Sequence, residues 1–202
     1  MHPELNRFPN RALRRHVGAC LLACAAGLCL LAGTAPRAHA QGADGDGQRD
    51  RQVKAAFLYK FLGYVEFPAQ AFASADAPLT IGVIGADELA AELARAVAGR
   101  TIRHHGVVVR QLHESDGAVP VHLLFVGGQD PEQVGRIVRQ ASAAMLVVTD
   151  CEDGLRQGSA INFRRVEQRV RFDVAPAAAE RHGIKLSSRL LAVANRVQKG
   201  MQ

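Results

Sequence analysis

The aromatic side chains of this chain are concentrated in one short segment, residues 53–68, with the sequence VKAAFLYKFLGYVEFP. It holds three of the eight Phe of the protein and both of its Tyr. At helical spacing its apolar residues share one broad stripe, which consists of Val53, Phe57, Phe61, Tyr64 and Val65. Pro68 is expected to end the helix. Burial of each such side chain contributes ~1.5–3 kcal/mol, so the helix is predicted to anchor the core of a small domain.

Residues 1–40 have the composition of a secretory signal peptide. Four arginines at positions 7, 11, 14 and 15 precede an apolar run at 17–33, and Ala38-His39-Ala40 fits the small-x-small pattern of a cleavage site. We therefore predict Sec-type export and cleavage after Ala40. Two other leaders match less well: Arg14-Arg15 lacks the continuation of a twin-arginine signal, and the lipobox-like Cys24 lies in the middle of the apolar run.

Removal of this leader changes the charge of the protein. Five arginines and one glutamate in residues 1–40 account for +4 of the formal +6, so the mature chain carries about +2. A nucleic-acid partner is therefore not expected. No other run approaches the ~20 apolar residues that cross a bilayer, so the mature chain is not expected to insert into a membrane.

Cys151 is the one cysteine of the mature chain, because Cys20, Cys24 and Cys29 belong to the leader. No intramolecular disulfide can then form. A single thiol in an oxidising compartment is either buried and inert or free to bridge to another molecule. Cys151 is thus a candidate for a redox role, but the interpretation that we favour is that this cysteine has no function of its own.

The remaining pattern predicts a single α/β domain at 51–202 after a flexible, Gly- and Asp-rich segment at 41–50. We expect a layered sandwich with a mostly parallel sheet, an antiparallel C-terminal strand pair and helices on both faces. Strands are predicted at 79–84, 107–112, 121–126, 145–149, 160–164 and 169–174, and helices at 87–97, 130–141 and from 187 onward.

Capping residues support two of these helices. Asp130 is expected to cap the first of them, with Gln133 reaching back to it, and Ser187 is expected to cap the last helix. In that last helix, Leu190, Val193 or Ala194, and Val197 should share a face.

No catalytic motif was found: the chain lacks a phosphate loop, GxGxxG, GxSxG and HExxH. We therefore do not expect an enzyme, and we expect no cofactor. His104, His105 and His113 could be considered as metal ligands, but adjacent histidines on a strand point to opposite faces, so no metal site is predicted. The glycines of IGVIG at 81–85 are read as a plain strand-to-helix turn.

Five polar or aromatic residues are candidates for contact with a partner or ligand: Tyr59, Lys60, Tyr64, Arg171 and Arg189. On the strand 169–174, Arg169, Arg171 and Asp173 alternate with apolar residues and are most simply a solvated face. The alternative is that Arg171, together with Lys60, lines a pocket or meets an acidic partner.

Two sequence blocks resemble one known family. KAAFLYKFLGYVEFP is similar to the opening helix of the YfiR/HmsC-like family, with Phe67 where that family often has Trp. GSAINFRRVEQRVRFDVAPAAAERHGIKLSSRLLAVANRV, residues 158–197, resembles the family's closing segments. With LTIGVIG between them, the resemblance covers essentially the whole mature chain.

The resemblance implies a periplasmic protein that binds the periplasmic portion of an inner-membrane diguanylate cyclase and represses it, which lowers cyclic di-GMP and biofilm formation. On this reading, envelope stress or a second envelope protein, such as an outer-membrane lipoprotein, removes the inhibitor from the cyclase. A homodimer is a further partner that we consider. Some relatives sense redox state through disulfides, which this chain cannot form. The rival interpretation is a periplasmic sensor module that binds a small molecule.

Overall fold

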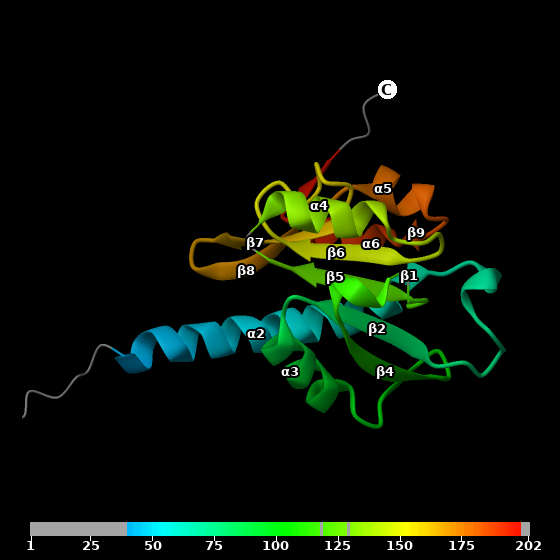
Figure 1. Cartoon of the computed structure of the whole chain (residues 1–202), viewed down its shortest axis with the longest axis horizontal. Coiled ribbons are helices and arrows are strands. Elements are labelled where there is room, and N and C mark those ends of the chain that lie inside the picture. The colour runs from blue at the N-terminus through cyan, green and yellow to red at the C-terminus, as the bar shows by residue number, and fades with distance from the viewer. Residues whose placement is uncertain (1–39, 118, 129, 199–202) are drawn as a thin grey trace, which may run out of the picture. The chain divides into compact units, whose positions relative to one another are not determined.

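A computed structural model describes residues 40–117, 119–128 and 130–198. The predicted signal peptide therefore lies, apart from Ala40, outside the described residues. The chain forms one eight-stranded sheet in the order β10-β8-β7-β6-β5-β2-β4-β3 and a small two-stranded sheet of β1 and β9 (Figure 1). The eight strands are β2 Leu79–Ile84, β3 Thr101–Ile102, β4 His105–Leu112, β5 Leu123–Gly127, β6 Leu146–Asp150, β7 Ile161–Val166, β8 Arg169–Val174 and β10 Arg196–Val197.

The pairing confirms the predicted fold class. Strands β4, β2, β5, β6 and β7 run parallel to one another, and the short β3 is antiparallel to β4 at one edge. The hairpin partner β8 is antiparallel to β7, as predicted for the C-terminal strand pair. The short β10 then extends the sheet beside β8 in parallel. The structure is thus an α/β domain with a mostly parallel sheet.

Helices cover both faces of the sheet. One face packs against α2 (Ala40–Gly63) and α3 (Asp87–Val97), whose apolar side chains join inward residues of the strands such as Ile81 and Phe125. The other face packs against α4 (Pro131–Arg139), which lies over Leu124 and Val147. The helix at 87–97 has the predicted bounds, and α4 ends two residues earlier than expected.

The aromatic helix α2 differs from its prediction at both ends. It ends at Gly63 rather than at Pro68, because Val65 and Glu66 form β1, which pairs antiparallel with β9 (Lys185–Leu186). It begins at Ala40, so residues 41–50, expected to be flexible, are helical in the structure. Once a helix is nucleated, each further residue adds a hydrogen bond, so a preformed α2 propagates into this weakly helical segment.

The stripe of α2 is also rotated from the expected one. The fully buried side chains of this segment are Ala55, Leu58, Phe61, Leu62 and Val65, while Val53 is 40% exposed. Phe57 and Phe61 pack on Phe163 and Phe172 of the β7–β8 hairpin. The predicted role of α2 as an anchor of the core is therefore confirmed, with Leu58 and Leu62 added to its buried face.

The capping predictions were partly correct. Asp130 caps α4, since its side chain accepts a hydrogen bond from the backbone nitrogen of Glu132 at 2.9 Å. Gln133 does not reach back to the cap: its side-chain amide donates to Glu114, which lies in the short helix η2 (Glu114–Asp116). Ser187 caps α6 (Ser188–Val193) as predicted, accepting from the backbone nitrogen of Leu190.

The C-terminal segment contains more elements than the sequence indicated. The helix α5 (Pro176–Arg181) was not predicted. Outside this segment, the short helix η1 (Ala69–Ala71) after Pro68 was not predicted either. Of the face expected for the last helix, Leu190 is buried and Ala194 packs against the same core, but the other members are wrong. Val193 is 67% exposed and Val197 lies in β10, because the chain leaves the helix at Ala194 to pair with β8.

Candidate functional site

A cavity lies at the carboxyl ends of the parallel strands. Chain order along the sheet runs outward from β2 to β4 and then returns to β5 on the other side of β2, so the direction of winding reverses between β2 and β5. Open α/β sheets bind ligands in the crevice at such a reversal. A cavity of about 510 Å³ opens there, and its lining includes Gly85 after β2, Gly127 and Gly128 at the end of β5, and Asp150 at the end of β6.

Two cations from α2 reach this cavity, and each meets a carboxylate. The Lys54 ammonium lies 2.5 Å from Asp150, and the Arg51 guanidinium lies 2.9 Å from Glu88 in the first turn of α3. Phe125 and Leu89 supply apolar surface. The cavity can therefore hold a small molecule with an apolar body and polar groups of both signs.

The backbone at Gly85 and Gly127 explains how the two turns come so close together. Gly85 has φ of +69°, and a Cβ atom placed on it would lie 2.5 Å from the Gly127 carbonyl oxygen. A side chain at position 85 would be strained by this φ and would collide with backbone. The two glycines thus keep the mouth of the cavity free of side chains.

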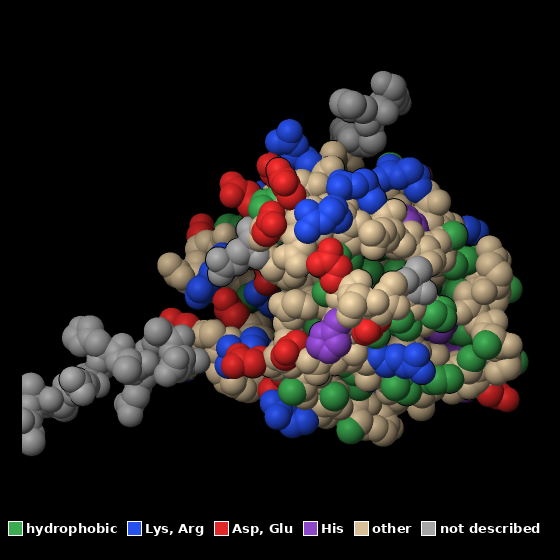
Figure 2. Space-filling view, in the orientation of Figure 1, with side chains coloured by type: hydrophobic (Ala, Val, Ile, Leu, Met, Phe, Trp, Pro, Cys, Tyr) green, Lys and Arg blue, Asp and Glu red, His purple; other side chains and the backbone are tan. Residues whose placement is uncertain are grey.

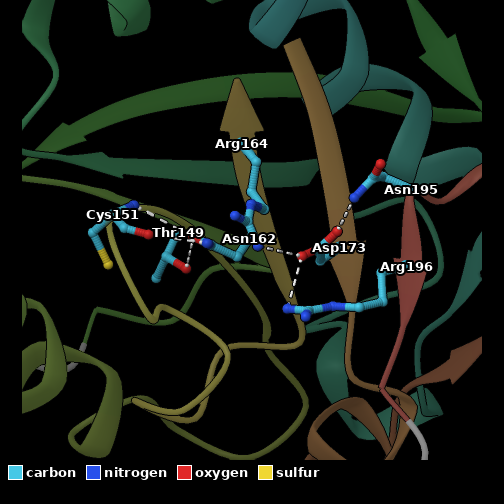
Figure 3. Close-up of polar contacts among 7 residues, drawn as sticks. All are labelled: Thr149, Cys151, Asn162, Arg164, Asp173, Asn195 and Arg196. Carbon is cyan, nitrogen blue, oxygen red and sulfur yellow. Dashed lines mark hydrogen bonds and ion pairs between the residues drawn. The ribbon is translucent and has the colours of Figure 1, made fainter. Parts of the chain in front are cut away.

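A second polar centre is built around Asp173 of β8, whose side chain is 1% exposed. Figure 3 shows three donors converging on its carboxylate: the Arg164 guanidinium at 3.3 Å, the Arg196 guanidinium at 3.1 Å and the Asn195 side-chain amide at 2.7 Å. The expectation that Asp173 lies on a solvated face is wrong. Strand β10 and the residue before it come from a distant part of the chain and cover this carboxylate.

A cleft of about 330 Å³ lies beside this centre. Its acidic residues are Asp150, Glu152, Asp153 and Asp173, and its basic residues are Arg164, Arg165 and Arg196. Asp150 lines this cleft and the cavity at the strand ends alike, so the two are neighbours. Figure 2 shows charged side chains of both signs crowded at the end of the molecule where β7 and β8 lie.

Cys151 sits in the wall of this cleft, in the turn after β6, and is half-buried. Asn162 holds the turn in place: its amide donates to the Cys151 carbonyl oxygen at 3.0 Å, and its own carbonyl oxygen accepts from the Thr149 hydroxyl at 2.7 Å (Figure 3). Burial raises the pKa of the Cys151 thiol, and the carboxylates of Asp150 and Asp153 raise it further, against an opposing hydrogen bond from Thr149. The thiolate, which is the reactive form, is therefore disfavoured.

Three of the candidate contact residues come from the aromatic segment. The Tyr59 ring is partly buried, its hydroxyl donates to the Thr101 carbonyl oxygen at 3.4 Å, and the Arg100 guanidinium lies 5.4 Å from the ring centroid. Lys60 is exposed, and Tyr64, between α2 and β1, is 39% exposed. Lys60 and Tyr64 are thus available to a partner, whereas Tyr59 packs against the chain itself.

The structure does not bring Arg171 and Lys60 together. Phe172 packs on Phe57 and Phe61 of α2, so its neighbour Arg171 projects from the opposite face of the sheet. Arg171 is exposed there, directly across the hairpin from Arg164. Arg189 lies in the first turn of α6 and is also exposed.

The histidines considered as metal ligands are separated in the structure. His104 lies in the turn between β3 and β4 with φ of +77°. His105 donates to the Ala77 carbonyl oxygen at 2.7 Å. His113 follows the far end of β4, ~26 Å from His105 along the strand. Within the described ranges, no group of three or more His, Cys, Asp or Glu side chains could hold a metal ion.

Sequence reasoning missed His122, which is 7% exposed among apolar neighbours. Its Nδ1 accepts from the Thr80 backbone nitrogen at 3.0 Å, so the proton is on Nε2, which has no hydrogen-bond partner. The Phe67 and Phe72 rings pack on the imidazole. Desolvation lowers the pKa of His122 and nearby His105 lowers it further. Its place in the apolar run VHLLFV was the available signal.

The doubly wound sheet, the cavity at its switch point and the polar cleft next to it define an α/β domain suited to binding. Across residues 51–195 the chain matches the model of the YfiR/HmsC-like family, and it belongs to that family. The family is periplasmic and regulatory rather than catalytic. No curated protein matches the chain. In the described part of the chain, no helix has the length and apolar character needed to span a membrane.

Proposed function

We propose that the mature chain, residues 41–202, acts in the periplasm and represses an inner-membrane diguanylate cyclase by binding the periplasmic portion of that enzyme. The observation that carries this proposal is the family match over residues 51–195, which covers the aromatic segment 53–68, the strands from β1 to β9 and the polar cleft apart from Arg196. Repression would lower cyclic di-GMP and, with it, biofilm formation.

The physical mechanism is a shift of population. A cyclase that exchanges between active and inactive conformations is driven toward the inactive one when the inhibitor binds that conformation more tightly. A second envelope protein, such as an outer-membrane lipoprotein, relieves repression by taking up the inhibitor, and a homodimer would be a further resting state. The signal crosses the membrane through the cyclase.

The test uses inner-membrane vesicles that carry the cyclase with its periplasmic side exposed. Addition of the purified protein should lower cyclic di-GMP synthesis in a saturable way, and the cyclase should be retained on the immobilised protein. Synthesis that stays unchanged at saturating protein, with no cyclase retained, would rule the proposal out.

The same assay tests the role of Cys151. Because its pKa is raised, we expect equal repression with and without reductant and equal repression by Cys151→Ser. Loss of repression in the serine variant would instead make the thiol part of the switch.

Export is tested separately by N-terminal sequencing of the protein recovered from periplasm. The expected first residue is Gln41. A protein retained in the cytoplasm with residues 1–40 intact would contradict the periplasmic location.

A second candidate function is a sensor that binds a small molecule. It is favoured by the cavity of about 510 Å³ at the switch point of the sheet. Nucleotides or aromatic metabolites at 100 times their Kd would add ~2.7 kcal/mol to stability, which a thermal shift detects. Lys54→Met should remove that shift if the ligand is anionic. A panel that gives no shift in the wild-type protein would argue against this function.

A further inference from the structure

The side of the sheet that carries α4 changes character from one half to the other. Under α4 the residues that face this side are apolar, for example Leu124 on β5 and Val147 on β6. On β7 and β8 the equivalent positions are Asn162, Arg164, Arg171 and Asp173, by the register of the hairpin. No helix of the described residues covers this half, and Figure 1 shows the hairpin extending past α4.

This uncovered half carries an excess of positive charge. Arg164, Arg169, Arg171 and Arg196 project from it, and Asp173 is the one carboxylate on the same face of these strands. Asp173 is engaged by Arg164 and Arg196. Among the described residues, no carboxylate lies within 4.0 Å of Arg169 or Arg171, and neither lines the cleft that holds the acidic turn.

One pair of side chains on this face is electrostatically unfavourable. Arg164 and Arg171 lie directly opposite each other on neighbouring antiparallel strands, where like charges repel. Arg164 gains a contact with Asp173, but Arg171 has no such compensation among the described side chains. An anionic group placed between them would convert the repulsion into attraction.

The backbone next to these arginines is also unpaired. On its outer side, β8 is paired with β10 only at Asp173 and Val174. The carbonyl oxygens of Phe172 and Val174 accept there from the backbone nitrogens of Asn195 and Gln198. Because backbone groups alternate in direction along a strand, the N–H and C=O of Val170 point to the same outer side, where no described strand meets them.

We propose that this free edge of β8, residues 169–171, binds an extended acidic segment of a partner protein. The segment adds as a strand beside Val170, and its alternate carboxylates meet Arg171 and Arg169. An extended chain repeats every two residues, as do these two arginines, so one register satisfies both backbone and charge. The inference deepens the proposed function by naming the docking surface, and it rests on that function only for the identity of the partner.

The structural alternative is that the arginines protect the edge from aggregation, as charged side chains do on many edge strands. Protection requires only that the edge repels other strands, and it predicts no saturable binding of an acidic peptide.

The test measures binding of a fluorescent octapeptide in which glutamate alternates with threonine, to protein purified after expression of the full chain. We expect saturable binding that Arg171→Glu weakens by about tenfold or more, which corresponds to ~1.4 kcal/mol. Arg110→Glu is the matched control, because Arg110 is an exposed arginine on β4, four strands away from β7 and five from β8. It should change the affinity less than twofold.

Two further probes separate strand addition from attraction to any anion. The same peptide with N-methyl groups at alternate peptide bonds keeps its charge but cannot pair with a strand, so its binding should be lost. Equal binding of the methylated peptide, or equal loss in Arg171→Glu and Arg110→Glu, would overturn the proposal. So would the absence of peptide binding combined with Arg171-dependent binding to phosphatidylglycerol vesicles.

The cyclase assay distinguishes this proposal from the proposed function. If the wild-type protein represses the cyclase and Arg171→Glu represses it equally, the edge is not the docking surface and the function stands. If the octapeptide binds as expected and no cyclase is repressed, the proposed function fails and the edge site stands.

Discussion

The two faces of the β7–β8 hairpin differ in almost every physical property. On one face, Phe163 and Phe172 pack against Phe57 and Phe61 of α2, with ring centroids 5.0–6.1 Å apart. On the other face, Asp173 is surrounded by arginines that remain about half exposed. One pair of strands therefore contributes to the core with one face and leaves the other face free for recognition.

The largest effect is expected on the aromatic face. Phe61→Ala should destabilise the protein by ~3–5 kcal/mol, because Phe61 is 1% exposed and contacts three other rings. The midpoint temperature of thermal unfolding should then fall by about 10 °C. The control is Val53→Ala, at an exposed position of α2, which should change stability by less than ~0.5 kcal/mol. Equal effects would show that α2 does not anchor the core.

A smaller loss is expected when the charged face is disrupted at its centre. Asp173→Ala leaves two guanidinium groups and the Asn195 amide without their acceptor, and should cost ~2 kcal/mol in urea unfolding, since the arginines can still be hydrated. Asp153→Ala, which breaks an exposed pair with Arg156, is the comparison and should cost less than ~0.5 kcal/mol. If both variants behave alike, burial of Asp173 contributes nothing.

His122 differs from the fully paired Asp173, because its buried Nε2 has no hydrogen-bond partner among the described residues. The pKa of His122 in the folded protein is lowered below 6.5, so below pH 6.5 the unfolded chain takes up a proton that the folded chain does not. Stability should therefore be retained above pH 6.5 and be lost as the pH falls toward the folded pKa. Thermal unfolding of His122→Gln should depend less on pH over this range. An identical pH profile in the variant would place the dependence elsewhere.

The smallest effect on stability is expected from the candidate docking residue. Arg171→Ala removes the repulsion with Arg164 and no described ion pair, so unfolding free energy should stay within ~0.5 kcal/mol of wild type or rise slightly. Unchanged stability together with a loss of peptide binding would show that Arg171 contributes to binding of the partner and not to folding. A marked destabilisation in urea would instead assign Arg171 a structural role.

The sequence was sufficient for the local features of the fold. The helix at 87–97, the strand 169–174 and the caps Asp130 and Ser187 follow from short-range patterns, and all are present. The end of α2 could not be predicted in the same way. The apolar side chain of Val65 would fit the last turn of a helix and a buried strand equally well. It lies in a strand because it pairs with Leu186, which is far away in the sequence.

The candidate site was less accessible to sequence reasoning. Alternation on β8 correctly placed Asp173 opposite to Phe172, but it cannot say whether the polar face meets water or a remote strand. The burial of Asp173 depends on Asn195 and Arg196, about twenty residues further along. Likewise, the pairing of Lys54 with Asp150 joins segments almost a hundred residues apart, and no local pattern announces it.

The pairing of β1 with β9 also has a kinetic consequence. It joins Val65 to Leu186, so the segment that directly follows α2 is held in place by residues that are made near the end of synthesis. Contacts that close such a long loop form slowly, because the loss of chain entropy precedes the gain from pairing. In a chain that crosses a translocation channel with its N-terminus leading, β1 and β9 could not pair until the C-terminal segments had emerged. Before that point this part of the chain would stay unfolded, and an unfolded chain is the form that can pass through a channel.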